Sequence, residues 1–192
     1  MKKNIWIYAL LGILVIMVIS VIVGYNSLVD SDEGVDKAQS EVVNRLNQRQ
    51  DLMGQLIPTV EGLQEHAEAI YDKIVEARKA YADSVDAGDV EGMIEADTLQ
   101  VEAITQLLIV IEDNPNIHAT SAFLGLMDNI SAMESALAQA RRDYNTSVGN
   151  YNTSVRKFPK VLYASLFGFE SEKPYWKMNN GADEIPQIDF SN

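Results

Sequence analysis

Apolar residues recur every three or four positions along most of the chain, which is the spacing of one buried stripe on an α-helix. The first stripe predicts one long helix over residues 31–85. Because proline lacks the amide hydrogen and clashes with the preceding turn, we expect this helix to kink near Pro58. The stripe consists of Val35, Ala38, Val42, Leu46, Met53, Leu56, Val60, Leu63, Ala67, Ile70, Ile74, Ala77 and Tyr81.

A second helix is indicated after the polar segment Asp86-Ala87-Gly88-Asp89, which is typical of a tight turn. Its stripe begins at Val90 and ends at Asn114-Pro115-Asn116, so the short turn makes this helix run back antiparallel to the first. The members of the stripe are Val90, Ile94, Val101, Ile104, Leu108 and Ile111.

A third helix begins near Thr120 or Ser121 and runs to Phe158, where Pro159 either ends it or restarts it as a short last helix through Phe167. The residues beyond Phe169 are rich in proline, glycine, asparagine and acids, and they are typical of an irregular tail. Since no strand pattern competes with these stripes, the fold class predicted is all-α.

The amino-terminal pattern is different, because Ile5 to Val23 form an uncharged apolar run of 19 residues. As a helix it would rise about 28 Å, against a hydrocarbon core of about 30 Å. The small residues of a signal-peptide cleavage site do not follow it. The sequence therefore predicts a retained transmembrane anchor over residues 1–24, an antiparallel bundle of three long helices plus a short C-terminal helix over residues 25–169, and an irregular tail over residues 170–192.

Charge and composition narrow the possible partners and chemistry. All 28 acidic residues but only 13 of the 15 basic residues follow Gly24, so this part carries a formal charge of −15. Such a surface repels nucleic acid and anionic headgroups, which reward clusters of lysine and arginine. The simplest interpretation of this negative charge is a solvated surface that keeps the domain soluble.

The inventory of catalytic and metal-binding motifs is empty. Cysteine is absent, which removes disulfides, thiolate metal sites and cysteine nucleophiles. The only histidines, His66 and His118, are not preceded by glutamate at the spacing of a di-iron bundle. Helical acid pairs such as Asp72 with Glu76 could bind a divalent cation, but a solvated face explains them better. With no nucleotide, phosphate or acyl-enzyme motif, we expect no cofactor, no metal and no enzymatic activity.

Three features suggest contacts between helices or chains. A five-residue repeat is the first of them: Tyr144-Asn145-Thr146-Ser147-Val148 recurs one heptad later, from Tyr151 to Val155. Asparagine at the contact between helices can set their register and the number of chains that associate. The alternative is that the tyrosines are ordinary core residues. Arg49 lies at the edge of the first stripe, either paired with an acid of another helix at an interface or snorkelling on the bundle rim. Phe167-Gly168-Phe169, with Tyr175 and Trp176, either docks a partner or clamps the tail onto its own bundle.

These segments together resemble the LemA family. The resemblance implies a single-pass membrane protein with a helical-bundle domain and no established biochemical activity. The matching pieces are the anchor followed by Tyr25-Asn26-Ser27-Leu28-Val29, then Val35 to Ser40, Leu46 to Leu52 running into Leu56-Ile57-Pro58, Arg141 to Asn145, Tyr151-Asn152, Phe158-Pro159, Phe167-Gly168-Phe169, Pro186 and Phe190.

Helix lengths predict self-association. As helices, residues 31–85 would extend about 80 Å, residues 90–113 about 36 Å and residues 120–158 about 58 Å. The shorter middle helix could not cover the other two, so the apolar stripes of residues 31–57 and of residues 144–158 would stay exposed and would be expected to bind a partner. A sharp break at Pro58 that folds residues 31–57 back onto the bundle is the competing explanation. The interface expected for a homo-oligomer consists of Val35, Val42, Leu46, Arg49, Met53, Tyr144, Tyr151, Val155 and Phe158.

The function expected from these features is that of a membrane-anchored scaffold or assembly protein. It would act through protein–protein contacts, with the membrane and a second copy of itself as partners. An accessory or sensor subunit of one particular membrane-protein partner is the second hypothesis, and an enzyme with an unfamiliar site is the third.

The flanking charges predict the side of the membrane. Lys2 and Lys3 precede the apolar run, whereas Lys37 is the only basic residue in the first twenty residues after it. Because basic residues favour the cytoplasmic side, we expect the amino terminus on the cytoplasmic side of the inner membrane and the domain in the periplasm. Protease added to intact spheroplasts should therefore cleave within residues 30–170. Complete protection of these residues would reverse the assignment.

Overall fold

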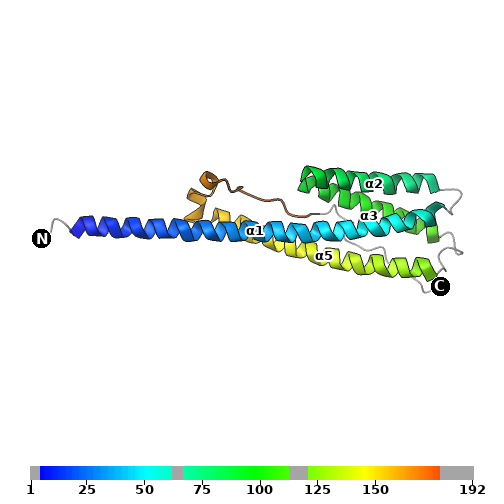
Figure 1. Cartoon of the computed structure of the whole chain (residues 1–192), viewed down its shortest axis with the longest axis horizontal. Coiled ribbons are helices and arrows are strands. Elements are labelled where there is room, and N and C mark those ends of the chain that lie inside the picture. The colour runs from blue at the N-terminus through cyan, green and yellow to red at the C-terminus, as the bar shows by residue number, and fades with distance from the viewer. Residues whose placement is uncertain (1–4, 62–66, 113–120, 178–192) are drawn as a thin grey trace. The chain divides into compact units, whose positions relative to one another are not determined.

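The computed structural model describes residues 5–61, 67–112 and 121–177, and these residues are almost entirely helical (Figure 1). No strand occurs among them, so the all-α prediction is confirmed. The long helices are α1 (Ile5–Glu61), α2 (Ala67–Ala87), α3 (Val90–Glu112) and α5 (Ser121–Arg156), and two 3-10 turns follow, η2 (Lys160–Leu162) and η3 (Ser165–Phe167).

The chain divides into two compact units. Among the described residues, unit 1 combines residues 5–39 with residues 143–175, and unit 2 combines residues 40–142 with Trp176 and Lys177. Helices α1 and α5 each contribute to both units, while α2 and α3 belong to unit 2 alone.

The prediction of one helix over residues 31–85 is wrong, because the described residues contain two helices there. Helix α1 continues through Pro58 and ends at Glu61, and α2 begins at Ala67 and lies beside α1 in the opposite direction. Gln50 and Arg78 are joined at 3.1 Å through their side chains, and the Tyr81 hydroxyl donates to the carbonyl of Val43 at 3.1 Å. The fold-back that competed with the overhang model is thus the better description, although the break lies beyond Pro58.

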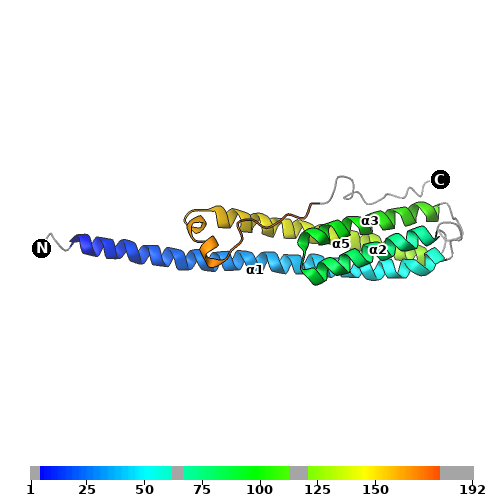
Figure 2. The same ribbon diagram turned by 90° about the horizontal axis from the view of Figure 1, so that it is seen from above.

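The turn between α2 and α3 is the one that its residues predict. Gly88 has a φ of 65°, a left-handed conformation that side chains disfavour, and its amide donates to the carbonyl of Val85 at 3.0 Å. The amide of Asp89 donates to the carbonyl of Ser84 at 2.9 Å. These bonds satisfy carbonyls at the end of α2, and Figure 2 shows α3 returning alongside it.

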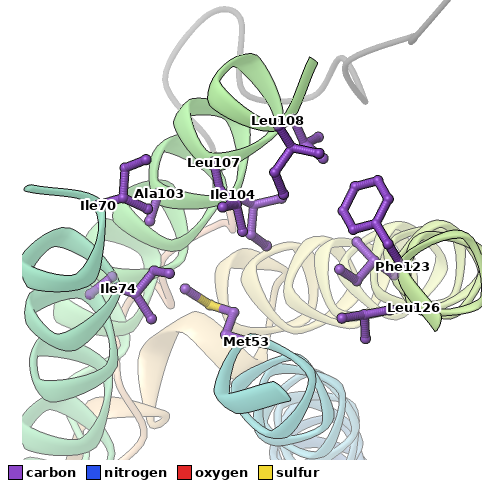
Figure 3. Packing of buried hydrophobic residues seen from close by; sticks show 12 residues of the cluster. Met53, Ile70, Ile74, Ala103, Ile104, Leu107, Leu108, Phe123 and Leu126 are labelled. Atoms are coloured by element: carbon purple, nitrogen blue, oxygen red, sulfur yellow. The ribbon is translucent and has the colours of Figure 1, made fainter. Parts of the chain in front are cut away.

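The apolar core of unit 2 is built from all four long helices. Figure 3 shows Met53 of α1 and Ile74 of α2 facing Ile104 of α3, with Phe123 and Leu126 of α5 on another side. Most of the predicted stripe positions whose burial is described are buried, but Val90, Ile94 and Val101 of α3 are only half-buried. The core consists of Met53, Ile70, Ile74, Ala77, Ala103, Ile104, Leu107, Leu108, Ile111, Phe123, Leu126 and Ile130.

Unit 1 is held together by the segment after α5, which folds onto α1 and α5. After the cis peptide between Phe158 and Pro159, the 3-10 turns bring Tyr163 against Gly24 of α1. Lys160 Nζ donates to Ser27 Oγ at 2.8 Å and to Ser154 Oγ at 2.7 Å, and so it links α1 to α5.

The aromatic segment Phe167-Gly168-Phe169 also packs against α1 within its own unit. The ring of Tyr25 meets the edges of Phe167 and Phe169, with centroids 5.1 and 5.7 Å apart. Clamping, the second of the two interpretations of this segment, is the one that the structure supports. The flanking lysines Lys2 and Lys3, both histidines, the helix stop at Asn114-Pro115-Asn116 and the tail beyond Lys177 lie outside the described residues.

The contact between Gly24 and Tyr163 yields a stability prediction. Gly24→Ala should destabilise unit 1, because the new Cβ would lie 1.8 Å from the Tyr163 hydroxyl oxygen and 3.1 Å from its Cζ. We expect a loss of about 1–3 kcal/mol in the free energy of unfolding, measured with denaturant on the solubilised chain.

Two variants control this experiment. Tyr163→Phe removes the clashing oxygen, a buried hydroxyl without a hydrogen-bond partner among the described residues, and should reduce the loss caused by Gly24→Ala. Gly34→Ala, on the same helix with open space around the new Cβ, should stabilise slightly. An equal effect of Gly24→Ala in both backgrounds would show that this contact does not form.

Candidate functional site

The most concentrated set of charged groups in the described residues lies inside unit 2. Arg49 comes from α1, Asp97 from α3, and Glu134 and Arg141 from α5. Arg49 and Asp97 are fully buried, at 0% exposure each. Charged side chains are almost never buried to this degree unless they are paired.

Each guanidinium nitrogen of Arg49 donates to a different residue. Nε donates to Gln100 Oε1 at 2.9 Å, Nη1 donates to Glu134 Oε1 at 2.9 Å, and Nη2 donates to Asp97 Oδ1. The planar fork of arginine therefore bridges α1 to both α3 and α5, which a single-point ammonium could not do as well. The interpretation of Arg49 as a snorkelling residue on the rim is wrong. Its pairing with acids of other helices is present, but within one chain.

Asp97 is the acceptor on which the cluster converges. Its Oδ1 accepts from Arg49 and also from Arg141 Nη2 at 2.7 Å. Its other oxygen, Oδ2, accepts from the indole Nε1 of Trp176 at 2.9 Å. The single carboxylate of Asp97 therefore joins α1, α3, α5 and Trp176 of the tail in one network.

Two arginines and two carboxylates make the cluster neutral overall. Burial lowers the pKa of Arg49, but the charges of Asp97 and Glu134 outweigh it and raise the pKa above its ordinary value. For Arg141, burial outweighs the attraction of Asp97, and the pKa is lowered. Nearby, burial raises the pKa of Tyr81 to about 12, with Arg49 opposing and Asp97 reinforcing the shift.

The cluster has two donors left over. Gln100 Nε2 and Arg141 Nε are buried and have no hydrogen-bond partner among the described residues. Each such group costs on the order of 1–3 kcal/mol. The ion pairs of the cluster run between helices, so it links α1, α3 and α5 to one another. The residues described also contain no group of three side chains suited to a metal ion.

A second polar network, in unit 1, involves the tyrosine repeat. The Tyr144 hydroxyl donates to the carbonyl of Pro174 at 3.0 Å, and the Tyr151 hydroxyl donates to the carbonyl of Glu170 at 2.8 Å. Asn152 bonds both ways with the backbone of Lys173, at 3.0 and 2.8 Å. The repeat thus binds the irregular tail of its own chain, which has backbone groups free to accept.

Lys173 connects this tail to α1 as well. Its Nζ lies 2.6 Å from Asp32 and 3.4 Å from Asp36. Burial lowers the pKa of Lys173, but the hydrogen bond and charge of Asp32, together with Asp36, outweigh it and raise the pKa.

The structure buries most of the predicted interface within the chain. The overhang argument is wrong because α2 folds back along residues 43–50 of α1, while the tail covers Tyr144 and Tyr151. Of the predicted set, Phe158 alone is exposed, at 79%. The buried members are Val35, Val42, Leu46, Arg49, Met53, Tyr144, Tyr151 and Val155.

Sequence reasoning missed most of the charged cluster. Asp97 and Gln100 lie four and seven residues after Met93, which is buried, so they occupy stripe positions on α3. This spacing from Met93 could have indicated that Asp97 and Gln100 are buried. Without knowledge of the neighbouring helices, however, two polar residues on a helix are taken to face solvent. Arg141 belonged to a segment of family resemblance, and neither Glu134 nor Trp176 was distinguished by any local pattern as part of this cluster.

Comparisons with known proteins match nearly the whole chain. A model described as the LemA family matches residues 38–190, a range that contains every residue of the charged cluster. Magnetosome protein MamQ of Magnetospirillum gryphiswaldense (strain DSM 6361 / JCM 21280 / NBRC 15271 / MSR-1) is 21% identical over 200 residues, which covers 91% of this chain and 74% of that protein.

Asp97 provides the sharpest test of the cluster. Asp97→Ala should lower the free energy of unfolding by about 3–5 kcal/mol, because it leaves two buried arginines with one remaining carboxylate. Asp128→Ala is the control, since Asp128 is an exposed aspartate on α5 and its loss should change stability by less than about 0.5 kcal/mol. Denaturant unfolding of the solubilised variants measures both, and equal small effects would contradict a buried network.

Proposed function

The chain belongs to the LemA family, and from this premise we propose that it is a membrane-anchored scaffold or assembly protein that acts through protein–protein contacts and self-associates. The inner membrane is the proposed location, with the bulk of the chain on the periplasmic side. No catalytic step is assigned to it.

One observation carries the proposal: a single uninterrupted helix contains both the apolar run and Arg49. Helix α1 is long and apolar enough to cross a membrane, and no other helix in the described ranges is. Its side chains from Trp6 to Val23 are mostly exposed, as expected of a surface that contacts lipid. The same helix supplies the guanidinium at the centre of the charged cluster.

The chemistry of the cluster supports a holding role. The three nitrogens of Arg49 donate to residues of α3 and α5, and the oxygens of Asp97 accept from Arg49, Arg141 and Trp176, so these groups are engaged within the chain. Buried ionic networks of this kind can impose one register on helices that apolar packing alone would let slide. A bundle with a fixed register presents a constant surface to other proteins.

We place the contact for self-association on the outer face of α2. Tyr71 and Val75 stand one turn apart on this helix, and each is 41% exposed. Aromatic residues with an aliphatic neighbour are typical anchors at protein interfaces. Of the residues that the helix lengths indicated for this role, all but Phe158 are buried, so the face of α2 replaces them in the proposal.

Light scattering on the detergent-solubilised full chain tests this proposal. The protein mass should be a multiple of one chain, and the double variant Tyr71→Glu with Val75→Glu should lower it. Ala69→Glu, at an exposed position on a different face of the same helix, adds a like charge and should leave the mass unchanged.

Affinity capture of the same preparation separates the proposal from its alternative. Recovery of tagged and untagged copies of this chain together supports self-association. A mass of one chain combined with one stoichiometric foreign membrane protein would overturn it, in favour of an accessory subunit.

A further inference from the structure

The segment after α5 exposes an unusual number of large apolar side chains. Phe158, Leu162 and Leu166 are 79%, 70% and 82% exposed, and two more, Val161 and Phe167, are about half exposed. These five side chains form what we call the η patch. A group of large apolar side chains exposed side by side usually marks a surface that binds a protein or a membrane.

The η patch is fastened beside the point where the apolar run of α1 ends. Val23 is the last residue of that run, and the next residue, Gly24, contacts the hydroxyl of Tyr163. Phe167 meets the ring of Tyr25 with a centroid distance of 5.1 Å, and Lys160 bonds Ser27. Because all these contacts lie within unit 1, the patch is at the level of residues 24–27 of α1.

The charge of this segment also differs from that of the rest of the chain. Residues 156–169 contain three basic residues, Arg156, Lys157 and Lys160, and no acidic residue, in a chain of formal charge −13. Lys157 is exposed next to Phe158. Basic side chains that flank apolar ones suit the boundary between phospholipid headgroups and acyl chains.

We propose that the η patch inserts into the headgroup boundary of the same bilayer that α1 crosses. This inference rests on the proposed membrane anchor, which puts residue 24 at the edge of the hydrocarbon core. Side chains fastened beside that residue are then within reach of lipid without any change in the fold. Interfacial apolar elements of this type sit about 5–10 Å into the headgroup region. The patch therefore gives unit 1 a second attachment to the membrane, beside its helix.

Site-specific fluorescence on the full chain tests the insertion. The natural chain has no cysteine, so single variants Leu166→Cys, Asn150→Cys and Ile13→Cys can each carry one environment-sensitive nitrobenzoxadiazole label. All three positions are exposed, and labelling should not disturb the fold. The labelled proteins are reconstituted into phosphatidylcholine vesicles with some phosphatidylglycerol, with quenching nitroxide lipids labelled near the headgroup or deep in the acyl chain.

The label at residue 166 should show blue-shifted emission and stronger quenching by the shallow nitroxide than the label at residue 150. Residue 150 is the matched control, because it is a polar position on α5 in the same unit. The label at residue 13 should be quenched most strongly by the deep nitroxide, which reports the anchor.

The outcomes are distinguishable. Quenching at residue 13 together with equally weak quenching at residues 166 and 150 would overturn the insertion and leave the anchor intact. A blue shift at residue 166 without lipid quenching would mean that protein covers the patch, and it too would overturn the insertion. Absence of quenching at residue 13 would overturn the anchor, and with it both proposals.

Discussion

The pairing of Arg49 with Asp97 is the interaction on which unit 2 depends. Each group alone would be costly to bury, and neither can leave the other without exposing an uncompensated charge to the interior. Glu134 and Arg141 complete the neutral set from α5. Because these residues come from three helices, the requirement that every charge be matched selects one register among many that the apolar stripes would allow.

Unit 1 meets a different constraint, which is the need to hold a tail without regular structure. The backbone carbonyls of such a segment lack partners of their own and must find donors. Tyr144 and Tyr151 supply hydroxyls to Pro174 and Glu170, and Asn152 supplies its amide to Lys173. The heptad spacing of the repeat places these donors along one side of α5, so the tail is bound as an extended strap. The repeat is therefore an intramolecular device in this structure, whatever contacts the chain makes with a second copy.

Helix α1 contributes different features to the two units. Helix α1 contributes its apolar run and Gly24 to unit 1 and contributes Arg49 to unit 2. The exposed apolar groups, which are the apolar run and the η patch, both belong to unit 1, while the charged cluster belongs to unit 2. Helix α1 therefore takes part in both units, with its apolar run in one and its buried guanidinium in the other.

The helical class and the turn at Gly88 could be predicted from the sequence, because periodicity and turn chemistry are local properties. The sequence did not determine that the stripe from Val35 to Tyr81 belongs to two helices, since the same spacing suits a continuous helix and a folded one. Only the contacts of Gln50 with Arg78 and of Tyr81 with Val43 distinguish them. Asp97 is the clearest case: an aspartate on a helix normally faces water, and it is buried here because Arg49, 48 residues earlier, meets it in space. Pairing across that separation depends on how the helices fold back, and no local pattern contains it.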